Sequence, residues 1–236
     1  MDLNSNLITL RERINAACGR AHRDPESVSL VAVTKNRPPE VVNAAVELGL
    51  NLFGENRVQE AKAKIGRCLG TSRWQLIGHL QTNKCRDAVH FFEMIQSVDS
   101  FNLAGEIDKW AAKAAKTMPV LLEVNVVGES AKFGFKPDQL LTDLEAVNAL
   151  PRIEVQGLMT MAPWSPHPEK ARPVFARLRE IKEQCEEILR VPLNHLSMGM
   201  SGDFEPAIEE GATMIRIGTA LFGARPPGRA KTERGA

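Results

Sequence analysis

The 236-residue chain contains no tyrosine, and aromatic residues make up only 5% of it. Any mechanism that needs a phenol as acid or base is therefore closed to this protein. No apolar run approaches the roughly 20 residues that span a bilayer. The first 20 residues carry two acids and three arginines without an apolar stretch, so they do not resemble a secretory signal. We therefore expect neither a membrane segment nor export.

Net charge and cysteine spacing exclude several further classes of binding partner. The net charge is only +1, which argues against nucleic acid or a membrane surface as the partner. The cysteines show no paired spacing and no CxxC motif, and the histidines show no metal-ligand spacing. We therefore predict reduced thiols, no metal site and a cytoplasmic location.

Short β-branched apolar runs alternate with amphipathic segments along nearly the whole chain. The predicted strands are residues 28–35, 51–55, 74–78, 94–98, 120–126, 153–160, 196–200 and 214–217. The predicted helices are residues 4–21, 40–48, 58–65, 83–92, 103–116, 137–150, 172–189 and 204–210. Strands joined through a helix are parallel neighbours. Eight such units favour a single α/β domain, a (β/α)8 or TIM barrel over residues 1–225, with an open doubly wound sheet as the alternative. The Pro, Gly and charge-rich residues 226–236 predict a disordered tail.

In a barrel, the functional site lies where the strands end. Active sites of such barrels are built at the carboxyl ends of the strands and from the loops that follow. The residues at these positions are Lys35, Glu55, Asn56, His79, Asp99, Asn125, Thr160, Met161, Met200, Ser201, Arg216, Gly218 and Thr219.

Lys35 ends the first apolar strand. A lysine held near low-dielectric surroundings has a lowered pKa, which frees its amine to attack an aldehyde. The alternative is a lysine that leaves the strand for solvent. Position alone favours a lysine that points to solvent. Only the loops after the seventh and eighth strands favour a reactive lysine instead.

Two loops with small and hydroxyl-bearing residues follow the seventh and eighth strands. Ser201 and Gly202 precede a helix that starts near residue 204, and a hydroxyl beside free amide groups there can bind an anion. Gly218 permits close approach of the backbone, and Thr219 offers a second hydroxyl. Barrel phosphate sites are usually built from these same loops. The pair predicts a phosphate-bearing ligand opposite Lys35, although Ser201 or Asp203 acting only as a helix cap would explain the first loop alone.

These residues carry a family resemblance. The chain resembles the YggS/PROSC family of pyridoxal phosphate homeostasis proteins through its segments VAVTK, FGENRVQEAKAK, WQLIGHLQTNK, KFGF, GLMTMAP and LSMGMSGDFEPAIEEGATMIRIGTALFG. The similarity runs in order from about residue 28 to 223, and its most specific stretches are residues 74–84 and 196–223. One departure is visible, because the family usually has histidine after the tryptophan where this chain has Gln75.

The resemblance implies a barrel similar to the N-terminal domain of alanine racemase, with an extra N-terminal helix. It implies pyridoxal 5'-phosphate as cofactor, held by a Schiff base on Lys35. Arg216 would face the pyridine nitrogen, and Asn56 would lie near the phenolic side of the ring. Ser201, Gly202, Gly218 and Thr219 would hold the phosphate, and Met200 is a further cofactor-binding residue.

Two function classes follow from this resemblance. The first is a carrier or buffer for cellular homeostasis of the cofactor, without dedicated catalysis, acting as a monomer and with cofactor-dependent apoenzymes as possible recipients. The second is an enzyme that uses the cofactor on amino acids, such as a racemase or decarboxylase. The absence of tyrosine removes the second base of alanine racemases. A third class, a Schiff-base aldolase for sugar phosphates, usually has its lysine on a middle strand. We therefore expect the homeostasis role, and a weak side activity stays compatible with it.

Overall fold

The computed structural model describes residues 2–70, 72–129 and 132–224, and the tail predicted over residues 226–236 lies outside them. Parallel strands close into one barrel in sequence order, and β8 pairs back to β1. They are β1 (Ser29–Val33), β2 (Leu52–Glu55), β3 (Arg73–Leu76), β4 (Met94–Val98), β5 (Met118–Glu123), β6 (Ile153–Met159), β7 (His195–Ser197) and β8 (Met214–Ile217). The predicted closed barrel is confirmed, and the open doubly wound sheet is wrong.

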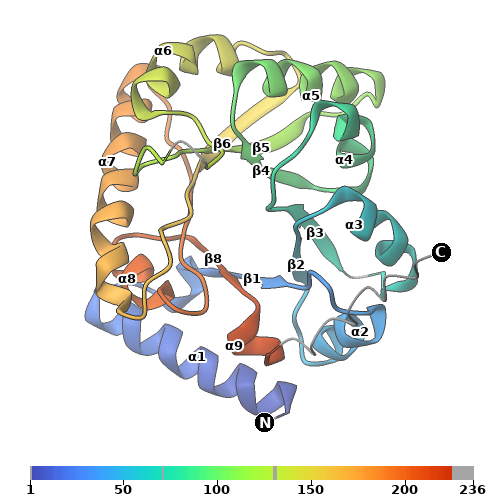
Figure 1. The fold of residues 1–236 in the computed structure, drawn as a ribbon, viewed down its shortest axis with the longest axis vertical. Coiled ribbons are helices and arrows are strands. Elements are labelled where there is room, and N and C mark those ends of the chain that lie inside the picture. The colour runs from blue at the N-terminus through green and yellow to red at the C-terminus, as the bar shows by residue number, and fades with distance from the viewer. Residues whose placement is uncertain (1, 71, 130–131, 225–236) are drawn as a thin grey trace, which may run out of the picture.

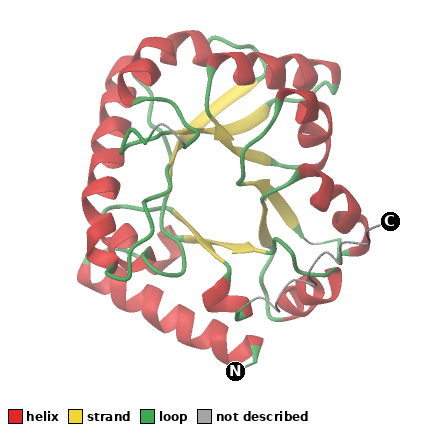
Figure 2. Ribbon diagram, in the orientation of Figure 1, coloured by secondary structure: helices red, strands yellow, loops and turns green. Residues whose placement is uncertain are grey.

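Helices form an outer layer around the barrel (Figures 1 and 2). They are α1 (Leu3–Arg20), α2 (Pro39–Glu47), α3 (Val58–Lys64), α4 (Cys85–Phe91), α5 (Phe101–Lys113), α6 (Pro137–Asn148), α7 (Arg172–Leu189), α8 (Phe204–Glu209) and α9 (Thr219–Phe222). Short 3-10 segments accompany them at η1 (Pro25–Ser27), η2 (Ile65–Arg67), η3 (Thr82–Lys84) and η4 (Pro168–Ala171). Each predicted strand and helix has its counterpart, with bounds that differ by a few residues.

The extra N-terminal helix, α1, joins the two ends of the described chain. It buries one apolar stripe, which includes Leu7, Leu10 and Ile14, and it lies beside α8 and α9 (Figure 1). The Arg13 guanidinium pairs with Glu205 of α8 at 2.8 Å. The Asn6 amide donates to the Leu221 carbonyl of α9 at 2.9 Å. The helix therefore packs against the last βα unit, β8 and α9, which contains one of the predicted phosphate loops.

Side chains alternate between the barrel interior and the helix layer, as the two-residue period of a strand requires. The interior apolar cluster is small and includes Val31, Val33, Ile77, Met94, Leu121, Met159 and Met214. The residues between them, such as Ala32 and Ile215, pack in the much larger cluster beneath the helices. This alternation decides which side chain reaches the barrel axis at each strand end.

The seventh strand ends earlier than predicted, at Ser197. Gly199 follows with a φ of +90°, and a Cβ there would lie 2.6 Å from the Cβ of Ala207. Only glycine fits a left-handed backbone pressed against α8. The chain therefore leaves the sheet before residue 200 and starts the loop that contains Ser201.

Candidate functional site

Lys35 continues the inward-facing row of β1. Val31 and Val33 point into the barrel, so two-residue alternation directs Lys35 toward its mouth. The side chain of Thr34 turns the other way, and its hydroxyl donates to Glu55 Oε1 at 2.6 Å. Lys35 is half-buried. The first strand was predicted too long, because β1 ends at Val33 and Lys35 lies two residues beyond it in the turn that follows, and the role of Lys35 stays a prediction.

A buried charged cluster holds the backbone on both sides of Lys35. The Lys64 ammonium from α3 donates to Glu55 Oε1 at 2.5 Å and to the Thr34 carbonyl at 2.8 Å. It also bonds Glu60, whose carboxylate accepts from the Asn36 N–H at 2.5 Å. Burial raises the pKa of Glu55, while hydrogen bonds from Lys64 and Thr34 act in the opposite direction. Because these contacts flank it, Lys35 has a fixed backbone position.

The loops after β7 and β8 lie against each other. The Ser201 hydroxyl accepts from the Ala220 N–H at 3.1 Å, and the Met200 N–H donates to the Asp203 carboxylate at 2.6 Å. A Cβ on Gly202 would meet open space. Within the described part of the chain, the backbone N–H groups that have no acceptor include those of Ser201, Gly202, Gly218 and Thr219. Unpaired N–H donors from two adjoining loops suit an anion with several oxygens.

Arg216 points into the barrel from β8 and is 3% exposed. Its Nη1 donates to the Ser197 hydroxyl at 2.7 Å, and its Nη2 donates to the Thr160 carbonyl at 2.8 Å. Burial lowers the pKa of Arg216 to about 10, while Glu123 and Asp203 oppose that shift. The guanidinium therefore stays charged at neutral pH, and it is anchored on β7 and on the residue that follows β6.

Glu123 ends β5 on the same interior side, 4% exposed. Burial raises the pKa of this carboxyl to about 7, with a further contribution from Asp99 and an opposing one from Arg216. No hydrogen bond to its carboxylate occurs among the residues that the structure describes. Sequence reasoning missed it. A glutamate inside the apolar run 120–126 was the available signal.

Asn56 and His79 line one small cavity of about 230 Å³ at the ends of β2 and β3. The Asn56 Oδ1 atom is buried and lacks a hydrogen-bond partner among the described residues. Gly78 lets the two strand ends approach, because a Cβ there would lie 2.4 Å from the Asn56 carbonyl oxygen. His79 Nδ1 donates to Asp99 Oδ2 at 3.1 Å, and the His79 ring stacks on Phe133 at a centroid distance of 3.5 Å.

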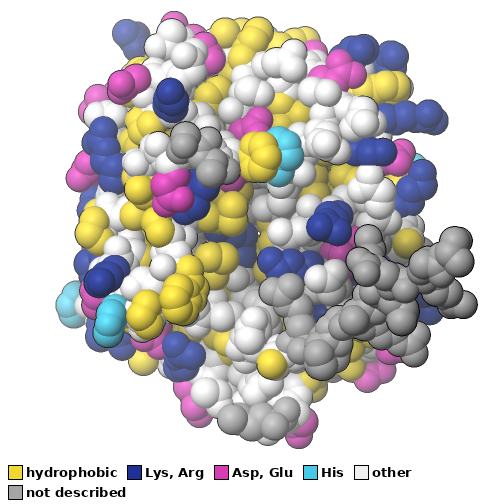
Figure 3. Space-filling model, in the orientation of Figure 1, with side chains coloured by type: hydrophobic (Ala, Val, Ile, Leu, Met, Phe, Trp, Pro, Cys, Tyr) yellow, Lys and Arg dark blue, Asp and Glu magenta, His cyan; other side chains and the backbone are white. Residues whose placement is uncertain are grey.

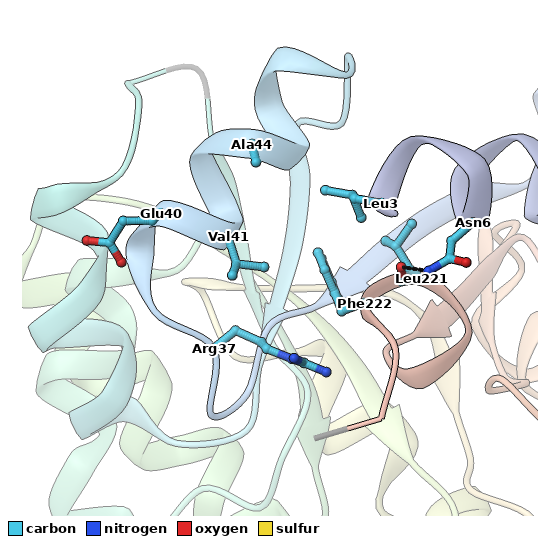
Figure 4. Close-up of a pocket in the computed structure, with 8 residues that line it drawn as sticks. All are labelled: Leu3, Asn6, Arg37, Glu40, Val41, Ala44, Leu221 and Phe222. Atoms are coloured by element: carbon cyan, nitrogen blue, oxygen red, sulfur yellow. Dashed lines mark hydrogen bonds between the residues drawn. The ribbon is translucent and has the colours of Figure 1, made fainter. Parts of the chain in front are cut away.

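A second cavity of about 300 Å³ adjoins Glu123 and Met200 and includes Met161, Trp164 and Lys132. Figure 3 shows hydrophobic and basic side chains gathered around the centre of the viewed face. The cavity in Figure 4, about 330 Å³, lies elsewhere, between α1, α2 and α9, and its lining is mostly apolar. That peripheral cavity reflects the packing of α1 and is not part of the barrel mouth.

The other predicted positions have structural contacts. Asn125 donates to the Glu129 carbonyl at 2.8 Å and so shapes the loop after β5. The Thr160 hydroxyl donates to the Val124 carbonyl at 2.7 Å. Both side chains therefore donate to backbone carbonyls of the loop that follows β5. Among the described residues, no three His, Cys, Asp or Glu side chains gather in a way that could hold a metal ion. No helix in the same ranges is long and apolar enough to cross a membrane.

Comparison with known proteins agrees with this geometry. Residues 5–226 match the family model described as alanine racemase, N-terminal domain. The pyridoxal phosphate homeostasis protein of Aquifex aeolicus is 45% identical over 95% of this chain and 99% of its own length. The protein of the same name from Pseudomonas aeruginosa is 41% identical over 94% of this chain and 96% of its own.

Solved structures show the same relationship. PipY of Synechococcus elongatus, with PLP bound, superposes with a TM-score of 0.84 at 36% identity, covering 94% of this chain and all of that one. An alanine racemase of Clostridium difficile shares the fold alone, with a TM-score of 0.75 at 16% identity over 96% of this chain and 58% of that one. The chain therefore belongs to the family of pyridoxal phosphate homeostasis proteins, built on the barrel of the alanine racemase N-terminal domain.

Proposed function

We propose that this protein binds pyridoxal 5'-phosphate through a Schiff base on Lys35 and serves the intracellular homeostasis of that cofactor. One observation carries the proposal. A lysine just after β1 shares the barrel mouth with two adjoining loops, in which the backbone N–H groups of residues 201, 202, 218 and 219 have no acceptor in the described chain. The family relationship and the PLP-bound structure of PipY support the same ligand.

The surrounding residues fit the different parts of this cofactor. Ser201, Gly202, Gly218 and Thr219 would hold the phosphate through N–H groups and hydroxyls, with Met200 at the edge of the same loop. Asn56, whose Oδ1 is buried without a partner among the described residues, would bond a polar group of the ring. Arg216, anchored on β7 and on the residue that follows β6, would face the pyridine nitrogen.

Arg216 bears on what the bound cofactor could do. When bound, pyridoxal phosphate supplies an aldehyde that condenses with amines and a ring that withdraws electrons from them. A guanidinium has no acceptor and stays charged, so it does not stabilise a protonated ring nitrogen as a carboxylate would. This arrangement favours holding and exchanging the cofactor over stabilising carbanions.

We further propose that the protein has no dedicated catalytic activity. The chain contains no tyrosine, which removes the phenolic base of alanine racemases. The relatives are named for homeostasis and not for a reaction. We expect no racemase or decarboxylase turnover above about one per minute, against roughly 1 to 1000 per second for ordinary enzymes. Cofactor-dependent apoenzymes as recipients, a monomeric state and a cytoplasmic location remain predictions.

The test uses the full chain loaded with pyridoxal phosphate. We expect a visible absorption band that borohydride bleaches, with the cofactor fixed on Lys35 when the peptides are mapped. Lys35→Ala should lose the band, and Lys84→Ala, at the end of η3 in the loop between β3 and α4, is the control. Reduction that fixes the cofactor on Lys84 or Lys132 would show that the site is elsewhere.

A turnover assay separates carrier from enzyme. The loaded protein is incubated with the common amino acids, and both enantiomers and carbon dioxide are followed. Sustained turnover that disappears in Lys35→Ala would make this protein an enzyme. Its absence, together with transfer of the cofactor to an apoenzyme, would support the carrier role.

A further inference from the structure

A continuous line of hydrogen bonds crosses the barrel interior from Arg216 to Glu93. Arg216 Nη1 donates to Ser197 Oγ at 2.7 Å, and Ser197 Oγ donates to Gln96 Oε1 at 2.6 Å. Gln96 Nε2 then donates to Gln75 Oε1 at 2.5 Å, and Gln75 Nε2 donates to Glu93 Oε1 at 3.4 Å. All members except Glu93 are buried. The line therefore joins a buried cation to a carboxylate that precedes β4.

The far end of this line lies at the opposite mouth of the barrel. Glu93 comes directly before β4, and its other oxygen pairs at 2.9 Å with Arg73, the first residue of β3. Both residues mark the amino ends of strands, whereas Lys35 and Ser201 follow carboxyl ends. The interior line consequently spans from the candidate site toward the face that does not carry it.

Every bond in the line has the same direction. The Ser197 hydroxyl has one proton, and because that proton goes to Gln96, an oxygen lone pair is left for Arg216. The Gln96 amide presents its oxygen to Ser197 because its nitrogen is held by Gln75. Aligned hydrogen bonds in a low-dielectric interior polarise and strengthen one another. The identity of residue 75 therefore decides what Ser197 offers to the guanidinium.

Packing alone does not explain this line. The neighbouring interior positions are apolar, among them Val31, Leu121 and Met214. Buried polar groups cost free energy unless each is hydrogen-bonded, and apolar residues of similar volume are often equally or more stabilising. A polar line that ends on Arg216 is most simply a support for that side chain. Ser197 and the Thr160 carbonyl together hold both Nη atoms, which fixes the plane of the guanidinium.

We propose that Gln75 and Gln96 are positioning residues, which act through Ser197 to set the orientation and hydrogen bonding of Arg216 toward the cofactor ring. This inference rests on the proposed function, since the ring is what Arg216 would meet. With leucine at position 75, Gln96 Nε2 loses its Gln75 acceptor and keeps only the weak contact with Met214 Sδ at 3.7 Å, so the amide is less firmly held. Ser197 is then no longer held as an acceptor for Arg216.

The experiment compares Gln75→Leu and Gln96→Leu with Gln75→His and Met94→Leu. Histidine at 75 can accept from Gln96 and donate to Glu93 through its two ring nitrogens, so it keeps the line. Met94 pairs in register with Gln75 and lies in the interior apolar cluster, so Met94→Leu changes packing at the same level without touching the line. Leucine at position 75 or 96 fills the interior with apolar volume. Thermal unfolding is used to check that each variant is folded.

Two readouts are taken, one without cofactor and one with it. In the cofactor-free protein, arginine side-chain NMR should show separate, slowly exchanging Arg216 Nη signals that merge in both leucine variants. In the loaded protein, the leucine variants should raise the dissociation constant of pyridoxal phosphate about five- to tenfold, the effect expected for one weakened bond to a charged group. They should also shift the pH midpoint of its absorption band. Gln75→His and Met94→Leu should match the parent in both.

Unchanged Arg216 signals, dissociation constant and midpoint in both leucine variants would overturn the inference and leave the line as core packing. Equal losses in Met94→Leu would overturn it too, because packing would then be the cause. If the parent protein takes up no pyridoxal phosphate, the proposed function fails. The cofactor-free Arg216 signals still decide whether the line positions the guanidinium.

Discussion

Two groups of buried charges, one outside the barrel wall and one inside it, are satisfied in different ways. Outside, Lys64 bonds Glu55, Glu60 and the Thr34 carbonyl, so its three ammonium protons all have partners. Inside, Arg216 uses Ser197 and Thr160, while Glu123 has no hydrogen bond in the described chain. In the outer cluster every proton of the cation is paired, and only Glu55 Oε2 is buried without a partner in the described chain, so these contacts support the fold. The inner cluster, which leaves the Glu123 carboxyl without a hydrogen bond in the described chain, is the one that we propose meets the bound cofactor.

Breaking the outer cluster should have the largest effect on stability. Lys64→Met leaves Glu55 buried without its cation, and such losses cost about 3–5 kcal/mol of unfolding free energy. Urea unfolding of the cofactor-free parent and variant measures this loss of unfolding free energy. The exposed pair Lys62–Asp87 is the control, and Lys62→Met should cost at most about 1 kcal/mol. The double variant Lys64→Met, Glu55→Leu should recover most of the loss, and similar losses in single and double variants would contradict this account.

The inner cluster should make the free energy of unfolding depend on pH. The folded-state pKa of Glu123 is about 7, above its ordinary value of 4.5, so its contribution to stability is complete below pH 4.5 and disappears as the pH rises through 7. Glu123→Gln removes this dependence. The stability of the variant relative to the parent should therefore increase by about 3 kcal/mol between pH 4.5 and pH 8.

Urea unfolding of both proteins across that range supplies the measurement. Glu154→Gln, at an exposed position of β6, is the matched control for loss of one carboxylate. A constant difference between Glu123→Gln and the parent would mean that Glu123 titrates as an ordinary surface acid.

The phosphate loops should affect ligand binding and leave stability nearly unchanged. Ser201→Ala and Thr219→Val each remove a hydroxyl that would bond the phosphate, a charge-assisted bond of about 1.5–3 kcal/mol, so retention of pyridoxal phosphate should fall roughly tenfold or more. Absorbance titration gives the dissociation constants. Thr142→Val, on the outer helix α6, serves as the control. Parent-like retention in the Ser201→Ala, Thr219→Val double variant would place the phosphate elsewhere.

The smallest effect concerns the ring stack at the rim of the site. His79 and Phe133 stack with an interplanar angle of 11°, and Phe133 is 55% exposed. Phe133→Ala should cost only about 0.5–1.5 kcal/mol, the usual value of an aromatic pair. Its effect should be local, with faster amide hydrogen exchange at Asn125 and Phe135, whose backbones are hydrogen-bonded to each other. Phe133→Leu keeps apolar bulk without the stack, and exchange as slow as in the parent would show that stacking contributes nothing.

Much of the fold and the location of the site followed from local patterns. Apolar runs of strand length and helical stripes are properties of neighbouring residues, which is why the strands at Met94–Val98 and Met214–Ile217 and the helix at Arg172–Leu189 begin and end where predicted. Lys35, Ser201 and Thr219 could be assigned to one mouth of the barrel because parallel strands end at the same side. The seventh strand was predicted too long because its early end depends on contact between Gly199 and α8.

The sequence by itself thus determined the barrel, and it predicted the mouth and the residues at which we propose that the phosphate-bearing ligand binds. Only the tertiary structure decided how the charges are paired. Gln96 meets Gln75 across 21 residues and Ser197 across 101, and no local period signals such contacts. The pKa of Glu123 depends on burial, on Asp99 after β4 and on Arg216 of β8. Partners brought together by barrel closure are set by register between strands, and register is a property of the closed sheet.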